Sequence, residues 1–501
     1  MCMVGLAALA ALVESFIVTA WKNSVWKMVT IVLFSLVHVT LIIVDYFLVF
    51  QFDMVCNQDV IDILSETNTG QTNDFIQSYF SSPSLLGVFI LISSLIVLAL
   101  FLNRWSENVV IRSLVGLFAV VGVTAILISG YGFVSYGNGY SIPQFSAPTR
   151  VACSLKILIQ RQKSIKQLNN VCQKVTGFCD LTQAPTIIVV IGESFSVYHC
   201  SLYGYEKETF PLLQQREKDG HLYVMRDVVC VADATHRNMK AIFSLGNGSS
   251  DFDIKPLFPA VFKNAGFKTA MYDNQYILGQ GVTFLTDKEL NSKLFDERNE
   301  RGYTYDGEML DDMCRLSNPA LYVFHLWGQH YRYANRYPES FHRFDEHDYR
   351  GIEHGDIVAH YDNANLYNDH VLNEIITKFE TDDALLVYFS DHGEEVYEQG
   401  FMGHGTSMTS MNFRYQLRVP MIIWMSNQFV QRRGDIAEKI QRSVNKPLMT
   451  SDVGHFLLDV AGINTDVFDA TRSFIHPKFD SSRPRLVMGG WDYDKHLEKL
   501  L

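Results

Sequence analysis

Charged residues are scarce at the start of this 501-residue chain. The first 130 residues contain only four of its 42 Lys/Arg and eight of its 54 Asp/Glu, whereas the rest has the charge content of a water-soluble domain. The mean hydropathy of +0.04 therefore averages two unlike parts. The composition predicts a membrane part followed by a globular part.

Basic residues and cysteines are also few. The net charge of −12 leaves no large basic surface for phosphate backbones, so we expect no nucleic-acid partner. Eight cysteines in 501 residues are too few for a disulfide scaffold, and 48% apolar residues exclude a disordered chain. Cys172 and Cys179 are candidates for a disulfide, but sequence alone does not fix the pairing.

Four apolar runs stand out within residues 1–133. Because about 20 apolar residues span a bilayer, we expect transmembrane helices at Val4–Ala20, Met28–Phe50, Leu85–Leu102 and Val109–Ser129. The first run is the weakest because Glu14 lies inside it. A signal sequence is the alternative there, although the run has no basic leader and no small-residue cleavage site.

The basic residues of this part predict its orientation. Lys22 and Lys27 lie at the gap between the first and second runs, and Arg104 and Arg112 lie at the gap between the third and fourth runs. Because basic residues mark the cytoplasmic side of a membrane protein, we expect both gaps to face the cytoplasm. The loop at 51–84 has five acidic residues and no basic one, so we expect it outside, with everything after about residue 134. An even number of spans also places the N-terminus outside, which a missing first helix would explain.

Residues 134–185 form a connector between the two parts. Its stretch 150–174 carries six basic residues and no acidic one, interleaved with apolar side chains. A basic amphipathic helix lying on anionic lipid headgroups is one interpretation. A solvated linker helix is the other.

The globular part, residues 186–501, alternates short apolar runs with helical patterns. We expect strands at 186–191, 321–326, 384–389 and 420–425, with helices such as 256–265 and 361–379 between them. Continuous apolar strands separated by helices predict a mostly parallel sheet covered on both faces. Ligands of such sheets bind beyond the carboxyl ends of the strands.

Acidic residues and histidines gather at these predicted strand ends. Glu193 follows the first run, Asp391 and His392 follow the third, and His325 and His330 lie at the end of the second. His404 follows in a Gly-His-Gly motif. Two carboxylates and an imidazole suit zinc, so we predict a metal site, whereas a single residue of this kind would be read as a helix cap or a structural histidine.

Several motifs together resemble the bacterial phosphoethanolamine transferase family. Val190-Ile-Gly-Glu-Ser194 and His199-Cys-Ser-Leu-Tyr-Gly-Tyr205 resemble its opening motif. The similarity continues at 262–267, 272–275, 325–330, 336–341, 361–363, 390–394, 404–405 and 419–424. Members of this family are inner-membrane enzymes with an alkaline-phosphatase-like (sulfatase-like) periplasmic domain. The resemblance implies the same fold and location for this chain.

The resemblance also implies roles for individual residues. Thr235, in the turn before a predicted helix, corresponds to the family's nucleophile, with a helix cap as its alternative role. A zinc ion would be held by Glu193, Asp391 and His392 with Thr235 as the fourth ligand, and the family pattern leaves room for a second zinc. The remaining site positions, which would contact substrate or a second metal, are His330, His404, His325 and Thr67.

The implied activity is a two-step transfer. Phosphoethanolamine would move from phosphatidylethanolamine to Thr235 and then to lipid A, lipopolysaccharide or another envelope glycan, which masks negative surface charge and weakens polymyxin-like peptides. Two alternatives stay open, namely a phosphoglycerol transferase of the lipoteichoic-acid-synthase type and a sulfatase-like phosphodiesterase. A true sulfatase is disfavoured because the chain has no Cys-x-Pro-x-Arg-like motif for the modified nucleophile.

Overall fold

A computed structural model describes residues 147–246, 254–275, 284–404 and 413–496, together with scattered positions between 25 and 72. The first, third and fourth predicted membrane runs and most of the second lie outside the described residues. Within the described part, the helices are too short or too polar to cross a bilayer. The predicted loop at 51–84 is described at only a few positions.

The chain divides into two compact units, Met1–Gln160 and Arg161–Leu501. In the first unit the described side chains of Leu48, Cys56 and Val60 are buried against one another. The backbone N–H of Cys56 donates to Asp45 at 2.8 Å. These contacts form a small apolar cluster within that unit.

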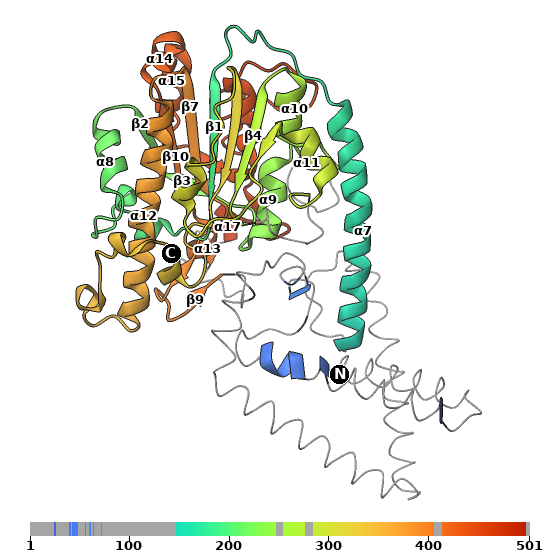
Figure 1. The fold of residues 1–501 in the computed structure, drawn as a ribbon, viewed down its shortest axis with the longest axis vertical. Coiled ribbons are helices and arrows are strands. Elements are labelled where there is room, and N and C mark those ends of the chain that lie inside the picture. The colour runs from blue at the N-terminus through green and yellow to red at the C-terminus, as the bar shows by residue number, and fades with distance from the viewer. Residues whose placement is uncertain are drawn as a thin grey trace, which may run out of the picture. The chain divides into compact units, whose positions relative to one another are not determined.

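The helix predicted over the basic connector is present as α7 (Ala147–Lys174) (Figure 1). Lys156, Lys163, Lys166 and Lys174 are exposed along it. Near its end Leu168 and Cys172 are buried in the core of the second unit. The last turns of α7 are therefore an integral part of the globular fold.

The second unit is built on a seven-stranded sheet with the order β2-β10-β7-β1-β6-β4-β5 in the described residues. Its strands are β2 (Leu222–Met225), β10 (Met421–Met425), β7 (Ala384–Ser390), β1 (Thr186–Gly192), β6 (Ala320–His325), β4 (Lys268–Asp273) and β5 (Glu297–Arg298). All neighbours pair in parallel except β10, which is antiparallel to β7 and to β2. The mostly parallel sheet predicted from the sequence is confirmed, and the four predicted strands match β1, β6, β7 and β10.

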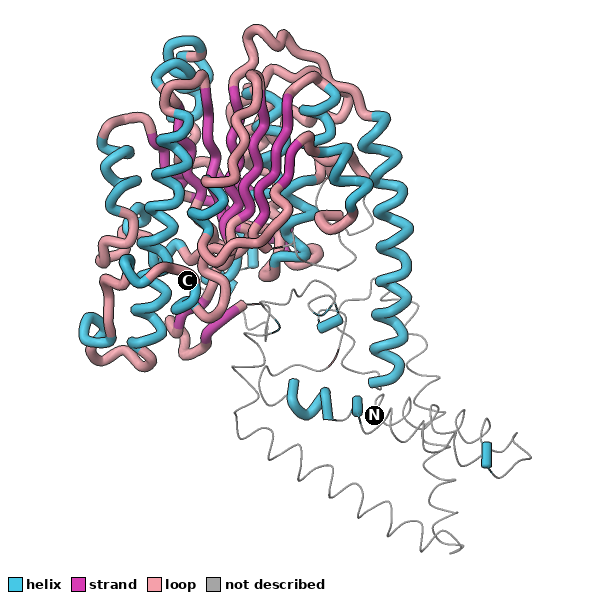
Figure 2. The backbone as a smooth tube through the Cα atoms, viewed as in Figure 1, coloured by secondary structure: helices cyan, strands magenta, loops and turns pink. Residues whose placement is uncertain are grey.

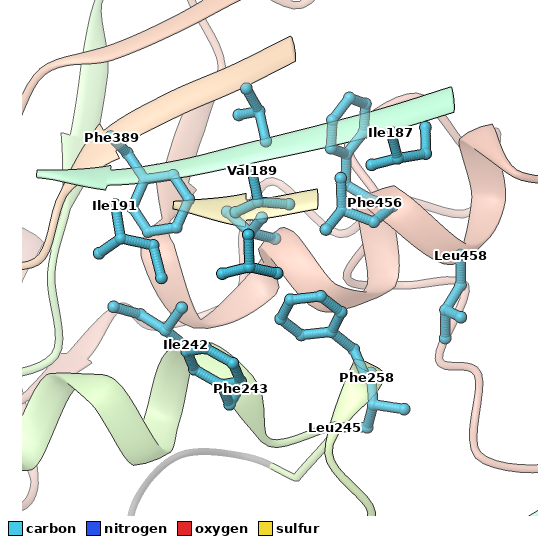
Figure 3. Packing of buried hydrophobic residues seen from close by; sticks show 14 of the residues in the cluster. Ile187, Val189, Ile191, Ile242, Phe243, Leu245, Phe258, Phe389, Phe456 and Leu458 are labelled. Atoms are coloured by element: carbon cyan, nitrogen blue, oxygen red, sulfur yellow. The ribbon is translucent and has the colours of Figure 1, made fainter. Parts of the chain in front are cut away.

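Apolar side chains of β1 bury themselves on both faces of the sheet, as a continuous apolar run requires. Ile187, Val189 and Ile191 pack against α9 (Thr235–Phe243), α10 (Phe258–Asn264) and α16 (Val453–Val460), as Figure 3 shows for several of these residues. Ile188 and Val190 face the other way, toward α8 (Pro211–Lys218) and α12 (Gly355–Phe379). Figure 2 shows the resulting layers, with strands between helices.

Shorter elements complete the unit. The helices are α11 (Lys288–Leu294), α13 (Phe413–Leu417), α14 (Asn427–Arg432), α15 (Gly434–Gln441) and α17 (Tyr493–His496). Small strand pairs are β3 (Asp227–Val229) with β11 (Pro447–Met449), β8 (Glu395–Val396) with β9 (Met402–Gly403), and β12 (Leu486–Val487) with β13 (Trp491–Asp492). The 3-10 turns are η1 (Val197–His199), η2 (Ser201–Tyr203), η3 (Asp306–Leu310), η4 (Tyr333–Asn335), η5 (Glu339–Phe341), η6 (Glu346–Tyr349) and η7 (Thr450–Asp452).

The candidate disulfide between Cys172 and Cys179 is not formed, since both residues are free thiols. Cys172 is buried at the end of α7, where its sulfur accepts the backbone N–H of Leu257 at 3.5 Å. Burial raises the pKa of this thiol to about 11. Cys172 therefore acts as an apolar core residue.

Candidate metal centre and nucleophile

Three of the predicted ligands meet at the carboxyl ends of β1 and β7. Gly192 pairs with Ser390 in the register of these two strands, so Glu193 and Asp391 emerge side by side. The backbone N–H of Asp391 donates to the carbonyl of Gly192 at 3.0 Å. Glu193, Asp391 and His392 are all fully buried. The parallel sheet thus brings the carboxylate of Glu193 next to Asp391 and His392, which lie about 200 positions further along the chain.

The carboxylate of Glu193 is held by donors on both oxygens. Ser194 Oγ donates to Oε1 at 2.6 Å, and Gln275 Nε2 donates to Oε2 at 3.0 Å. Ser194 has a φ of 54°, in the left-handed region that a non-glycine residue occupies only at a cost of about 1–3 kcal/mol. Such strain persists only where surrounding contacts impose it.

A glycine allows the loop after β6 to lie against Glu193. Gly328 has a φ of 51°, and a Cβ there would sit 2.9 Å from both the backbone N and O of Glu193. The next residue, Gln329, donates its backbone N–H to the Glu193 carbonyl at 3.1 Å. Asp306 fastens the same loop by accepting the backbone N–H groups of Trp327 and Gly328. This close approach brings His330 to the site.

Thr235 enters the site as the first residue of α9. Its hydroxyl donates to Glu193 Oε2 at 3.0 Å and lies 3.1 Å from His392 Nε2. The N-cap position belongs to Ala234, whose methyl group cannot accept a hydrogen bond. The alternative role of Thr235 as a helix cap is therefore wrong, because its side chain is directed at Glu193 and His392.

Two other hydroxyls in neighbouring motifs serve the backbone instead. Ser196 Oγ accepts the N–H of Tyr198 at 3.3 Å and caps η1. Thr209 Oγ1 accepts the N–H of Ser201 at 3.1 Å and donates to the carbonyl of His199 at 2.9 Å. Within the described residues, Thr235 is the threonine whose hydroxyl contacts both Glu193 and His392.

The imidazole of His392 presents one nitrogen to the carboxylates. Nδ1 lies 2.8 Å from the carbonyl of Gly393, which assigns its proton to that bond. Nε2 lies 3.2 Å from Glu193 Oε1 and 3.5 Å from Asp391 Oδ2. Among the described residues, Asp391 Oδ2 is buried without a hydrogen-bond partner. An orphaned carboxylate oxygen beside a second carboxylate indicates a position for a cation.

The pKa values of these groups express the same excess of negative charge. Burial and the neighbouring Glu193 raise the pKa of Asp391 to about 7. Burial alone would lower the pKa of His392, but Asp391 and Glu193 outweigh it and raise that pKa to about 10. Burial would raise the pKa of Glu193, yet the imidazolium of His392 holds it well below its usual range. The residues present therefore fit zinc, which takes carboxylate oxygen and imidazole nitrogen ligands.

His404 and His330 are half-buried beside this group, and His404 offers an alternative ligand set. Donor atoms of Glu193, His392 and His404 fall within 4.8 Å of one another. The ring of His404 is 4.0 Å from that of His392, and its Nδ1 contacts Glu394 Oε2 at 2.5 Å. Burial lowers the pKa of His330 to about 4, against the opposing charge of Glu193.

His325 contacts Glu193 indirectly, through Gln275. Its Nδ1 is 3.0 Å from Asp273 Oδ1, and its Nε2 is 3.1 Å from the Gln275 amide that supports Glu193. The last predicted position, Thr67, lies outside the described residues. The structure thus brings together Glu193, Thr235, Asp391, His392 and His404, with His330 beside them.

Gln275 and Asp273 were not predicted as site residues. Both follow or end β4, the strand next to β6, and so lie at the same edge of the sheet as the other strand-end residues. The strand-end rule, applied to 268–273, would have found them. Gln275 carries no charge, and a search for metal ligands and acid–base groups passes over such a residue.

Comparison with known proteins places the chain in a family. Residues 185–463, more than half of the chain, match the family described as Sulfatase, and the chain belongs to that family. The resemblance to phosphoethanolamine transferases is also confirmed. Phosphoethanolamine transferase EptC of Escherichia coli O18:K1:H7 is 29% identical over 455 residues, which cover 84% of this chain and 78% of that protein.

Two solved structures extend the likeness to the fold. The C-terminal periplasmic domain of Escherichia coli EptC, solved in complex with Zn, has 29% identity and a TM-score of 0.55, covering 62% of this chain and 93% of that one. The integral membrane protein lipooligosaccharide phosphoethanolamine transferase A from Neisseria meningitidis has 17% identity and a TM-score of 0.63. It covers 94% of this chain and 95% of that chain, which shows a shared fold.

Proposed function

We propose that this chain is a zinc-dependent phosphoethanolamine transferase that acts through a covalent intermediate on Thr235. The observation that carries the proposal is the hydroxyl of Thr235, which lies within 3.1 Å of both Glu193 and His392 at the carboxyl edge of the sheet. The similarity to EptC over 84% of the chain supports the choice of the transferred group.

In the first half-reaction the Thr235 oxygen attacks the phosphorus of phosphatidylethanolamine. Glu193 Oε2 accepts the hydrogen bond of the hydroxyl at 3.0 Å and so orients the oxygen. At neutral pH the hydroxyl loses its proton only with the help of a base or a metal. The bond between phosphorus and the diacylglycerol oxygen breaks, and the proton released from Thr235 passes to that oxygen as diacylglycerol leaves. Phosphoethanolamine stays on Thr235, where the N-terminus of α9 favours negative charge.

In the second half-reaction an acceptor hydroxyl or sugar phosphate of lipid A, lipopolysaccharide or another envelope glycan displaces Thr235. The proton that the acceptor gives up passes to the Thr235 oxygen, and the site is restored. His330 and His404, half-buried beside the proposed ligands, would contact the transferred phosphate or a second metal. Their contribution is the binding and orientation of the anionic oxygens.

Zinc, when bound by Glu193, Asp391, His392 and Thr235, supplies positive charge that favours the deprotonated hydroxyl and the phosphoryl oxygens. The same arrangement accounts for the burial of two carboxylates, which a single imidazole cannot neutralise. The transmembrane location belongs to the same proposal, with residues 1–133 in the inner membrane and the catalytic unit in the periplasm, where the lipid donor and the glycan acceptor meet.

The test uses the full chain in detergent with phosphatidylethanolamine and no acceptor. We expect a burst of one diacylglycerol per active site and a phosphoethanolamine mass on the peptide that contains Thr235. Thr235→Ala should abolish both, and Thr182→Ala, at an exposed turn, is the matched control.

The donor and the acceptor are then identified separately. A burst from phosphatidylglycerol instead would favour the phosphoglycerol transferase alternative. Release of headgroup into water without a modified peptide would favour a phosphodiesterase. Mass spectrometry of lipid A and other envelope glycans from cells with and without the protein names the acceptor.

A further inference from the structure

The motif Tyr361-Asp362-Asn363 has no part in the proposed chemistry, yet all three side chains are fully buried in α12. Buried polar groups almost always have hydrogen-bond partners, so the partners of these three show what they hold. Asp362 and Asn363 bind loops: Asp362 accepts from His199 and Tyr205, and Asn363 accepts the backbone N–H groups of Arg343 and Phe344. Tyr361 binds the turn that carries Glu193.

The hydroxyl of Tyr361 makes two hydrogen bonds to the backbone of this turn. It donates to the carbonyl of Ser194 at 2.7 Å and accepts the N–H of Ser196 at 2.8 Å. Ser194, which supplies the carbonyl and directly follows Glu193, is the residue with a φ of 54°. The Tyr361 hydroxyl therefore provides hydrogen bonds for the Ser194 carbonyl and the Ser196 N–H, two buried backbone groups of the left-handed turn that need partners.

The conformation of the turn determines where the proposed ligands point. Ser194 follows Glu193 directly, and its hydroxyl donates to Glu193 Oε1 at 2.6 Å. Its backbone N–H is directed at Asp391 Oδ1 at 3.4 Å. If Ser194 relaxed to an extended conformation, Glu193 Oε1 would lose its contact to the Ser194 hydroxyl and Asp391 Oδ1 would lose its contact to the Ser194 N–H. Each carboxylate would then be held on fewer sides.

The ring of Tyr361 is itself fixed by its neighbours. His199 packs edge-on at 5.1 Å between ring centroids, and Tyr333 does so at 4.8 Å. His199 is in turn held by Asp362 at 2.8 Å. A hydroxyl on a ring held from two sides has a fixed position from which to hold the turn.

We propose that Tyr361 is a positioning residue for the metal centre, which holds Glu193 and Asp391 in ligand geometry by clamping Ser194. This inference rests on the proposed metal site, but it does not depend on the identity of the donor or of the acceptor. Tyr361 touches no reacting atom in this scheme.

The first test compares zinc affinity of the full-length protein in Tyr361→Phe with that of the wild type, by competition with a chromogenic chelator. Loss of a group bonded to a metal ligand typically weakens metal binding 10–100-fold. Tyr361 acts one residue further out, through Ser194, so we expect a change at the lower end of that range, about 10-fold. Tyr322→Phe is the matched control, because its hydroxyl accepts a backbone N–H, that of Leu316 at 2.6 Å, away from the site. The melting temperatures of the two metal-free variants should fall by similar amounts.

The second test asks whether the effect passes through the strained turn. In Ser194→Gly the left-handed conformation costs little, so adding Tyr361→Phe to that variant should weaken zinc binding less than it does in the wild-type background. Equal losses in both backgrounds, or unchanged zinc affinity in Tyr361→Phe, would overturn the positioning role while leaving the metal centre intact. A wild-type protein that binds no zinc would contradict the metal centre and this inference together.

Discussion

Two buried carboxylate–histidine pairs lie at neighbouring strand ends of the same sheet, and they are used differently. Asp273 and His325 are register partners on β4 and β6, and Asp273 also accepts from Arg298 at 3.2 Å and from the N–H of Gln275 at 2.9 Å. Asp391 and His392 are joined by a second buried carboxylate, Glu193, while Asp391 Oδ2 has no hydrogen-bond partner among the described residues.

The difference lies in charge balance. Burial would raise the pKa of Asp273, but His325 and then Arg298 hold it below its usual range, so this pair needs no further cation. At the second pair, burial and Glu193 raise the pKa of Asp391 to about 7. We therefore expect a buried Asp–His pair at a strand end to be a structural support when a cation already neutralises it, and propose a metal there when negative charge is left over.

The largest expected effect comes from an isosteric pair of substitutions. Asp391→Asn removes a ligand charge and should weaken zinc binding more than the 10–100-fold typical of outer-shell changes, with loss of transfer activity. Asp273→Asn makes the same atomic change one strand pair away and should leave zinc stoichiometry at the wild-type value. Elemental analysis of both proteins checks this. Full zinc occupancy in Asp391→Asn would show that this residue is not a ligand.

His404 tests the alternative ligand set. If Asp391 is a ligand and His404 contacts substrate, His404→Ala should retain zinc and lower kcat/KM about 10–100-fold. His347→Ala, at an exposed histidine, is the control. Loss of zinc from His404→Ala would instead assign the centre to Glu193, His392 and His404, the three whose donor atoms cluster within 4.8 Å.

The sequence predicts one of these two pairs better than the other. Glu193, Asp391 and His392 directly follow apolar runs, and the rule that parallel strands end at one edge was enough to bring them together. The pairing of His325 with Asp273 depends on the register between β4 and β6, which no local pattern reports. Thr235 was found only through the family resemblance, because a threonine before a helix looks like a cap.

The fold was predictable for a similar reason. Fully buried strands such as β1 and β7 have no polar alternation to obscure them, so their bounds agree with the apolar runs. Helix α12 begins at Gly355, six residues before the predicted start. Its buried Asp362, Asn363 and Asn368 break the apolar pattern, because they bind loops and other side chains instead of filling the core.

At the supporting pair, stability should change more than function. Asp273→Asn weakens a buried charge-assisted contact to Arg298 and His325, so we expect a loss of about 1–3 kcal/mol in the free energy of unfolding. Transfer activity should fall only through Gln275, whose backbone N–H Asp273 accepts. Thermal unfolding of the zinc-loaded proteins measures the first effect. An unchanged melting temperature would contradict the structural role.

The smallest expected effect is a pH dependence that distinguishes the pairs in metal-free protein. The folded pKa of Asp391 is raised to about 7 from a usual value near 4, so its proton stabilises the fold at low pH, and that contribution is lost as pH rises from about 4 through about 7. Asp391→Asn has no such proton. The melting temperature of metal-free Asp391→Asn should therefore rise by a few degrees relative to that of the wild type as pH is raised from 5 to about 7.5.

The pKa of Asp273 is lowered, so the sign is opposite there. The contribution of Asp273 to stability is present above its unfolded pKa and is lost only when pH falls below that range. Above about pH 5 the Asp273 carboxylate itself therefore adds no pH dependence, and any that appears in metal-free Asp273→Asn comes through His325, whose pKa Asp273 raises. Zinc should remove the pH dependence at Asp391. Parallel curves for the metal-free wild type and Asp391→Asn would mean that the negative charge at Asp391 is already balanced without a metal.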